Sequence, residues 1–180
     1  NRRRGRECRG HQREWSGAGG RPGRQREGRD ARRQRGTRVE SKTGHVRTAS
    51  GTIVVRGVIR ELDASTVSGP LLVGMEGAVA WARLETVSSE IAFKGDLDPE
   101  GRLDAETHGG DVELRLPVRL GAAYHLVSYG GGLVNDLVPP SAVRQGPGKG
   151  EWTFRTGDGR AAVEVRTFKG TVTLRVRGDR

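Results

Sequence analysis

The sequence has little cysteine, no zinc-binding motif and no long apolar run. Cys8 is the only cysteine in 180 residues, so no disulfide can form within the chain. The spacings C-x-x-C and H-x-x-x-H are absent, which leaves no zinc module to hold a fold together. No run approaches the roughly 18 uninterrupted apolar residues of a membrane helix. A single domain of this length must therefore depend on an ordinary hydrophobic core.

Lysine is absent from residues 1–36, which carry 13 Arg and four acids and account for +9 of the net charge of +10. The excess charge therefore says nothing about residues 37–180. The segment shows no helical or strand period and too little apolar surface to offset its ordering entropy, so we expect it to be disordered. Two interpretations stay open. It is either an Arg/Gly-rich arm that binds the phosphates of nucleic acid, or a linker or spurious extension translated from GC-rich DNA.

An internal repeat organises the rest of the chain. Its unit reads Thr-x-(Ser/Gly)-Gly-x-apolar-x-apolar, and the first residue of each unit is called the anchor below. The anchors are Thr48, Thr66, Thr86, Thr107, Ser128 and Thr167. Their steps are 18, 20, 21, 21 and 39 residues, the last being close to two units. Such regular spacing predicts a stack of similar structural units.

Each unit alternates like a strand on both sides of its anchor, which predicts the inward-facing residues. Apolar residues four and two positions before the anchors are Leu62 and Ala64, Ala82 and Leu84, Leu103 and Ala105, Tyr124 and Leu126, and Val163 and Val165. Those after the corners are Ile53/Val55, Leu71/Val73, Ile91/Phe93, Val112/Leu114 and Val172/Leu174. The inward-facing residues lie an even number of positions before the anchor but an odd number of positions after it. This change of parity needs an irregular corner, and we expect the Ser/Gly-Gly pair to supply its backbone freedom.

A repeat of about 20 residues cannot bury its apolar face alone, so successive units must stack. The predicted fold class is all-β, a single-domain β-solenoid over residues 37–180 with roughly seven coils. Crossover rules favour a right-handed coil. Proline and glycine residues interrupt the alternation at about residues 136–150, and this predicts a loop that leaves the stack as a surface excursion or a binding loop.

Three motifs carry a family resemblance. Residues 65–69 read STVSG, residues 85–91 read ETVSSEI and residues 106–117 read ETHGGDVELRLP. Over roughly residues 39–177 the sequence resembles the bacterial adhesin-like β-strand-repeat family, domains of unknown function whose coils read Thr-Val-Ser-Gly-Asp-Ile/Val. The resemblance implies a non-catalytic, extracytoplasmic or envelope-associated β-solenoid. The chain begins at Asn1 without an apolar signal region, and we expect it to be a fragment or a processed form.

Groups that could carry chemistry are scattered. The acids Asp96, Asp98, Glu100 and Asp104 surround one turn, but they lack the ligand order of an EF-hand and suit a solvated turn better than a calcium site. The histidines His45, His108 and His125 fall in different coils without a fixed partner. The segment at residues 146–150, GPGKG, lacks the Ser/Thr of a phosphate loop. We therefore expect no catalytic, cofactor or metal site.

The one exception concerns the face beside the predicted loop, and a separate column of charges has a structural interpretation. The chain could bring His125, Tyr129, Asp136 and Lys149 together beside the predicted loop once it folds. Three residues before successive anchors, Asp63, Arg83, Asp104 and His125 predict an alternating ladder of charge down one outer face.

With the location that the family resemblance implies, we expect a non-enzymatic envelope or secreted module. It has either a structural role or an adhesin-like one, in which it presents a rigid β surface to an envelope polymer, a membrane component or a surface protein. One alternative is a nucleic-acid-associated protein that binds through the Arg-rich residues 1–36. A second alternative is a polysaccharide-acting enzyme, because β-helical folds also carry lyases and hydrolases and a fold alone does not decide function.

Overall fold

The computed structural model describes the backbone of residues 35–146 and 150–178, with side chains from residue 41 onward. Most of the Arg-rich segment and Lys149 therefore lie outside the described residues. The described chain is all-β and forms one sheet of eleven strands that does not close. The elements are β1 (Arg35–Ser50), β2 (Ile53–Ser68), β3 (Leu71–Thr86), β4 (Ile91–Thr107), β5 (Val112–Leu116), β6 (Ala122–Ser128), β7 (Leu133–Asn135), the 3₁₀ turn η1 (Pro140–Ala142), β8 (Arg144–Gln145), β9 (Glu151–Arg155), β10 (Ala161–Thr167) and β11 (Val172–Val176).

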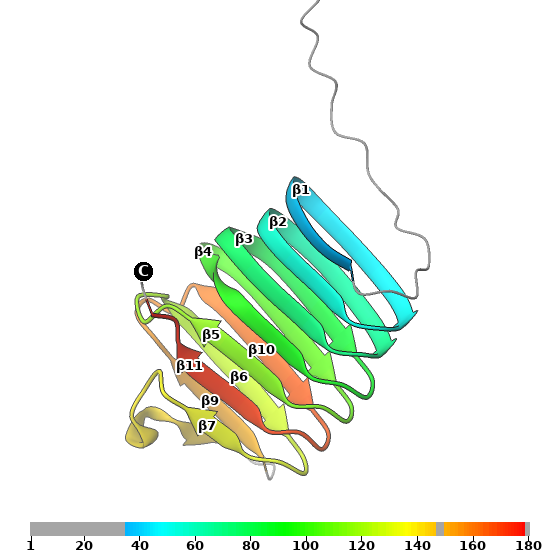
Figure 1. The fold of residues 1–180 in the computed structure, drawn as a ribbon. Coiled ribbons are helices and arrows are strands. Elements are labelled where there is room, and N and C mark those ends of the chain that lie inside the picture. The colour runs from blue at the N-terminus through cyan, green and yellow to red at the C-terminus, as the bar shows by residue number, and fades with distance from the viewer. Residues whose placement is uncertain (1–34, 147–149, 179–180) are drawn as a thin grey trace, which may run out of the picture.

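The first four strands are long and bent, and they stack in parallel (Figure 1). The register aligns one anchor with the next, Thr48 with Thr66, Thr66 with Thr86 and Thr86 with Thr107. Each bent strand thus supplies one half after a corner and one half before the next anchor. We call each layer of the stack, one repeat unit in height, a tier. The repeat spacing read from the sequence is the number of residues from one tier to the next.

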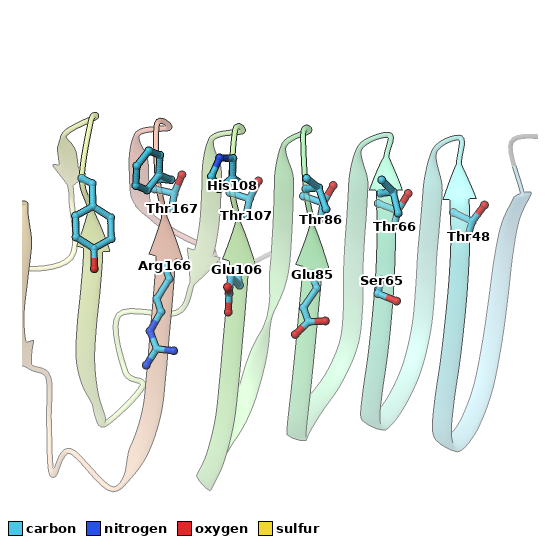
Figure 2. Close-up of a pocket in the computed structure, with 14 residues that line it drawn as sticks. Thr48, Ser65, Thr66, Glu85, Thr86, Glu106, Thr107, His108, Arg166 and Thr167 are labelled. Carbon is cyan, nitrogen blue, oxygen red and sulfur yellow. The ribbon is translucent and has the colours of Figure 1, made fainter.

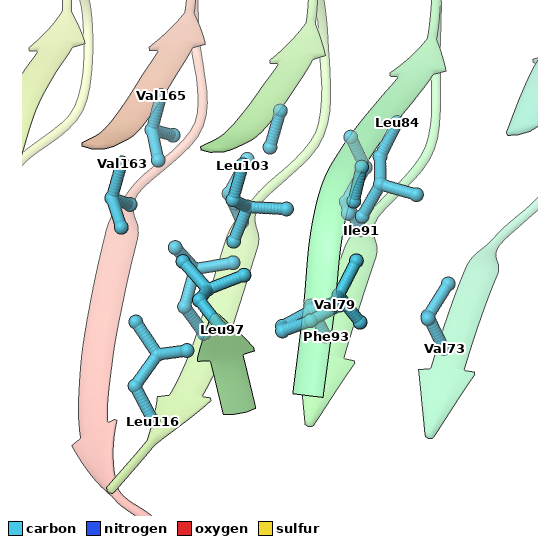
Figure 3. Close-up of a cluster of buried hydrophobic side chains, with 14 of the residues drawn as sticks. Val73, Val79, Leu84, Ile91, Phe93, Leu97, Leu103, Leu116, Val163 and Val165 are labelled. Atoms are coloured by element: carbon cyan, nitrogen blue, oxygen red, sulfur yellow. The ribbon is translucent and has the colours of Figure 1, made fainter. Parts of the chain in front are cut away.

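The core lies between the two halves of the bent strands. All ten residues predicted to face inward before the anchors are buried, as are all ten predicted after the corners. Figure 3 shows Leu84, Ile91, Val79 and Phe93 meeting inside the stack. The anchors Thr66, Thr86, Thr107, Ser128 and Thr167 are buried as well. The parity argument from the sequence is therefore confirmed in its register.

The tiers do not follow the order of the sequence. The C-terminal repeat, β10 and β11, lies between earlier elements: β10 pairs with β4 on one side and β6 on the other, and β11 pairs with β5 and β7. In space the anchors run Thr48, Thr66, Thr86, Thr107, Thr167, Ser128. The step of 39 residues is thus a return of the chain into an inner position, and it does not extend the stack at its end.

The segment that follows β7 packs against the end of the stack. Leu137, Val138 and Val143 are partly buried against the core. After it, β9 runs antiparallel to β6, and β8 pairs with β9. Within its described residues, the predicted loop at 136–150 therefore covers apolar surface at this end. The result is a partial cap over the last parallel tier.

The corner glycines are required mainly because neighbouring corners approach closely. A Cβ on Gly170 would lie 1.8 Å from the Gly110 carbonyl oxygen, and one on Gly131 would lie 2.1 Å from the Gly170 carbonyl oxygen. Of the corner glycines, Gly51 and Gly69 have positive φ, 108° and 139°. The expected reason, backbone freedom, therefore applies to Gly51 and Gly69, and the close approach of neighbouring corners explains Gly110, Gly131 and Gly170.

Candidate functional site

A groove of about 620 Å³ runs along the corners of the stack and crosses its tiers (Figure 2). We call it the corner groove. Its floor is formed by the anchors from Thr48 to Thr167. One wall consists of the residues just before the anchors, Ser65, Glu85, Glu106 and Arg166. The other consists of the residues just after them, Val67, Val87, His108, Phe168 and Tyr129.

The second wall is an exposed apolar ladder. Tyr129 is 69% exposed, and Val67, Val87 and Phe168 are about half exposed. The rings of His108 and Phe168 stack with centroids 4.9 Å apart and planes 4° from parallel. Tyr129 is tilted by 44° against Phe168 at 5.6 Å. Such an arrangement leaves a strip of apolar surface open to a ligand.

The first wall is mainly acidic. Glu85 and Glu106 are register partners on β3 and β4, so two like charges lie side by side. Glu85 accepts a hydrogen bond of 2.7 Å from Arg83 Nε. Among the described residues Glu106 has no ion pair or hydrogen bond, and the guanidinium of its neighbour Arg166 donates to Glu164. The Glu106 carboxylate is therefore open to a ligand.

A smaller hollow of about 230 Å³ adjoins this wall. It shares Glu85, Glu106 and Arg166 with the corner groove and also includes Trp81 and Arg102. The acidic wall thus has one hollow on each side. A ligand that crosses it would meet an aromatic side chain in either hollow.

The anchor hydroxyls in the groove floor are not equivalent. Thr107 Oγ1 donates to the Ser89 carbonyl at 3.0 Å and accepts from the Gly110 N–H at 3.1 Å. Within the part of the chain that the structure describes, Thr66 Oγ1 and Thr86 Oγ1 are buried without a hydrogen-bond partner. These two hydroxyls lose their hydration without compensation.

The four acids considered for calcium do not converge. Each pairs with a different arginine: Asp96 with Arg119, Asp98 with Arg60, Glu100 with Arg160, and Asp104 with Arg102. Across residues 35–146 and 150–178, no group of three or more His, Cys, Asp or Glu side chains is placed to hold a metal ion. Their surroundings are those of solvated ion pairs.

The three histidines have separate environments. His45 Nδ1 lies 3.5 Å from Asp63 Oδ2, and His108 belongs to the corner groove. His125 lies between two carboxylates, with Nε2 3.1 Å from Glu151 Oε1 and Nδ1 4.0 Å from Glu164 Oε1.

The four residues considered beside the predicted loop are His125, Tyr129, Asp136 and Lys149. The core separates the first two from Asp136. His125 and Tyr129 belong to β6 and its corner, whereas Asp136 follows β7 and pairs with Arg175 at 3.6 Å. The strands β6 and β7 contribute to different halves of the stack. Lys149, the fourth member, lies outside the described residues.

The predicted charge ladder needs a correction. Because the C-terminal repeat is inserted, Glu164 stands between Asp104 and His125 in register. Two acids are then neighbours, and the alternation fails. Arg102 bridges them, with Nε 2.9 Å from Asp104 Oδ2 and Nη2 3.0 Å from Glu164 Oε2. The bridge offsets the repulsion that the insertion creates.

Sequence reasoning did not find the corner groove. Its signal is the column one residue after each anchor, where the apolar or aromatic Val67, Val87, His108, Phe168 and Tyr129 occupy positions that the parity assigns to solvent. Their order in space depends on the inserted repeat. The rings of His108, Phe168 and Tyr129 become neighbours only because the C-terminal repeat is inserted between the other two repeats.

No family model, curated protein or solved structure matches this chain. The resemblance to the adhesin-like β-strand-repeat family therefore stays a prediction that rests on the corner motifs. The described residues contain no helix with the length and apolar character needed to cross a membrane.

Proposed function

We propose that the chain is a non-catalytic surface-binding module of the bacterial envelope, and that its corner groove binds a polysaccharide. In this proposal the stacked repeats form a single-domain β-solenoid, with the right-handed course that crossover rules favour. The envelope location rests on the family resemblance. A rigid stack holds its exterior columns in fixed positions, which suits recognition of an extended polymer.

The exposed apolar ladder is the observation that carries the proposal. It crosses five neighbouring tiers and ends in three rings in contact. Ligand sites combine apolar or aromatic surface with a few polar groups that fix orientation. Sugar rings match this combination, because their C–H faces pack on aromatic side chains while their hydroxyls bond to carboxylate and guanidinium groups. Glu106 and Arg166 supply those groups on the facing wall.

The charge of the groove favours a neutral polymer. Its walls hold two glutamates and one arginine, and Arg166 is already paired with Glu164. A phosphate or uronate chain would meet net repulsion from the glutamate wall, whereas a neutral glycan would not. The groove is therefore a poor match for nucleic acid.

The nucleic-acid alternative acts through residues 1–36. It predicts salt-dependent binding to RNA or DNA by the full chain and loss of that binding in residues 35–180, which keep all of β1. Strong binding by the shortened chain would place the nucleic-acid site on the β-sheet instead.

One pair of residues bears on the second alternative, a polysaccharide-acting enzyme. Glu85 and Glu106 are register partners on adjacent strands, whose spacing of about 4.8 Å is close to the separation of about 5 Å between the carboxylates of retaining glycosidases. Here both side chains point the same way from one sheet face, so they cannot flank a glycosidic bond from opposite sides. Release of reducing sugar that disappears in Glu106→Gln would nevertheless establish the enzyme.

The test of glycan binding uses the full chain on an array of neutral and acidic polysaccharides. Phe168→Ala and Tyr129→Ala should each weaken neutral-glycan binding at least fivefold, because each removes about 1 kcal/mol or more of aromatic contact. Val118→Ala is the matched control, since Val118 is also exposed, at 64%, and lies outside the groove. Equal binding by all four proteins would contradict the groove as the site.

A further inference from the structure

The last repeat of the chain fills an inner position of the stack. We call that position the slot, bounded by β4 and β5 on one side and by β6 and β7 on the other. Both strands pair in parallel with both boundaries: β10 with β6 over its whole length and with β4 from Ala162 to Thr167, and β11 with β5 over its whole length and with β7 from Val172 to Leu174. Figure 1 shows β10 between β4 and β6. Without this repeat, four strands would each lose a partner.

The contacts in the slot are specific on both sides. Toward the preceding tier, Thr167 Oγ1 donates to the Gly110 carbonyl at 3.0 Å, and the Thr171 N–H donates to Asp111 Oδ1 at 2.7 Å. Toward the following tier, Ser128 Oγ donates to the Gly170 carbonyl at 2.7 Å. The slot therefore recognises a complete strand–corner–strand unit with an anchor and a glycine.

A short link connects this repeat to the rest of the molecule. Residues 156–160 cross the beginning of β6, where the Thr156 N–H donates to the Ala122 carbonyl at 2.9 Å. Gly157 has φ of 51°, and a Cβ there would lie 2.9 Å from the Gly121 Cα. The closed link is thus compact and depends on a left-handed glycine.

We propose that the slot is an interaction surface for the C-terminal repeat of a second copy of this chain. The described strands of the repeat pair only with the slot boundaries, and a second copy offers the identical slot. Exchange keeps every contact within the slot and changes only the path of the link, which are the conditions for domain swapping. Five extended residues span up to about 17 Å, enough to reach an abutting copy.

The exchange would make the corner groove a shared site. Arg166, Thr167 and Phe168 come from the inserted repeat. In the swapped dimer each groove takes these residues from the partner copy, and Phe168 still stands between His108 and Tyr129. The dimer then carries two complete grooves, whatever ligand they bind.

The test is a disulfide placed across the slot in the full chain. Ala123 and Ala162 are register partners, both half-buried on the outer face, and adjacent strands bring their Cα atoms within disulfide range. Ala123→Cys/Ala162→Cys, in a Cys8→Ser background, is unfolded and then refolded at a series of protein concentrations. Swapping predicts cross-linked dimers whose fraction rises with concentration, and cross-linked monomers at low concentration.

A control pair distinguishes swapping from random cross-linking. Val54 and Leu72 are register partners on β2 and β3, and two residues join these strands, so Val54→Cys/Leu72→Cys should give monomers at every concentration. Dimers in the control pair, or monomers alone in the slot pair at every concentration, would overturn the proposal.

The link provides a second, independent measurement. Gly157→Ala penalises the left-handed closed link by about 1–2 kcal/mol but leaves an extended link unstrained. Each swapped dimer opens two links, so the dimerisation constant should rise roughly thirtyfold to several hundredfold. Leu103→Ala, a substitution in the buried core, weakens both forms alike and should not change the ratio. No change with Gly157→Ala would contradict the exchange.

Discussion

Thr167 Oγ1 donates a 3.0 Å hydrogen bond to the carbonyl oxygen of Gly110, a residue 57 positions earlier in the chain. The same hydroxyl accepts from the Gly170 N–H at 3.0 Å. An anchor therefore fastens its own corner and the corner of the neighbouring tier at once. At Thr107, Ser128 and Thr167 this double role explains why a small hydroxyl residue occupies an inward position of an apolar core.

Removing the anchor hydroxyl should lower stability at Thr107 but not at Thr86. Thr107→Val removes two hydrogen bonds and leaves their backbone partners without them, so the free energy of unfolding should fall by about 1–3 kcal/mol. Thr86→Val removes a buried hydroxyl that has no partner among the described residues, so stability should stay equal or rise. Urea denaturation measures both. A larger loss in Thr86→Val than in Thr107→Val would contradict this account.

The corner glycines should tolerate a methyl group very unequally. In Gly170→Ala the added Cβ would stand 1.8 Å from the Gly110 carbonyl oxygen, so tiers must separate at a cost of about 1–3 kcal/mol or more. In Gly132→Ala no heavy atom lies within 4 Å of the added Cβ, and stability should change by at most about 1 kcal/mol. Thermal unfolding of the pair tests whether close approach is the reason for glycine.

Alkaline pH should weaken the fold through Tyr124. Burial raises the pKa of this phenol from 10.0 to about 12, against a smaller lowering by its hydrogen bond with Thr156. The unfolded chain therefore loses the proton first, and stability is fully present below pH 10 and declines as pH rises toward 12. A shift of two units corresponds to roughly 2–3 kcal/mol.

The matched variant for this pH dependence is Tyr124→Phe. It keeps the stack of residue 124 on Phe154, whose ring centroid lies 4.5 Å from that of Tyr124, and it removes the titrating group. Unfolding free energies from pH 9 to pH 12 should fall less steeply in the variant. Identical slopes would show that Tyr124 is not the cause.

Glu106 should matter for glycan binding and little for stability. Its carboxylate stands in register between Glu85 on one side and Arg166 on the other, so Glu106→Gln removes one repulsion and one attraction and should change stability by at most about 0.5 kcal/mol at either salt concentration. The same change should weaken glycan binding, because a charged acceptor is replaced by a neutral one. Urea titrations at two salt concentrations and binding to a neutral glycan measure the two effects. Unchanged glycan binding by Glu106→Gln would remove Glu106 from the site.

The amino-acid sequence by itself determined the strands, the inward residues and the corners. Leu84, Ile91 and Phe93 were predicted inward and are buried, because side chains on a strand alternate faces and a single exposed core residue is costly. These are local rules, so neighbouring residues suffice to apply them. The anchors could be found for the same reason.

The order of the tiers was decided only by the tertiary structure. Every repeat carries the same anchor, corner and apolar pairs, so the local pattern of the repeat with Thr167 fits beside Thr107 as well as beyond Ser128. Only the return of the chain through β9 and residues 156–160 selects the inner position. That selection places Phe168 between His108 and Tyr129. The corner groove therefore could not be read from repeats whose contacts are interchangeable.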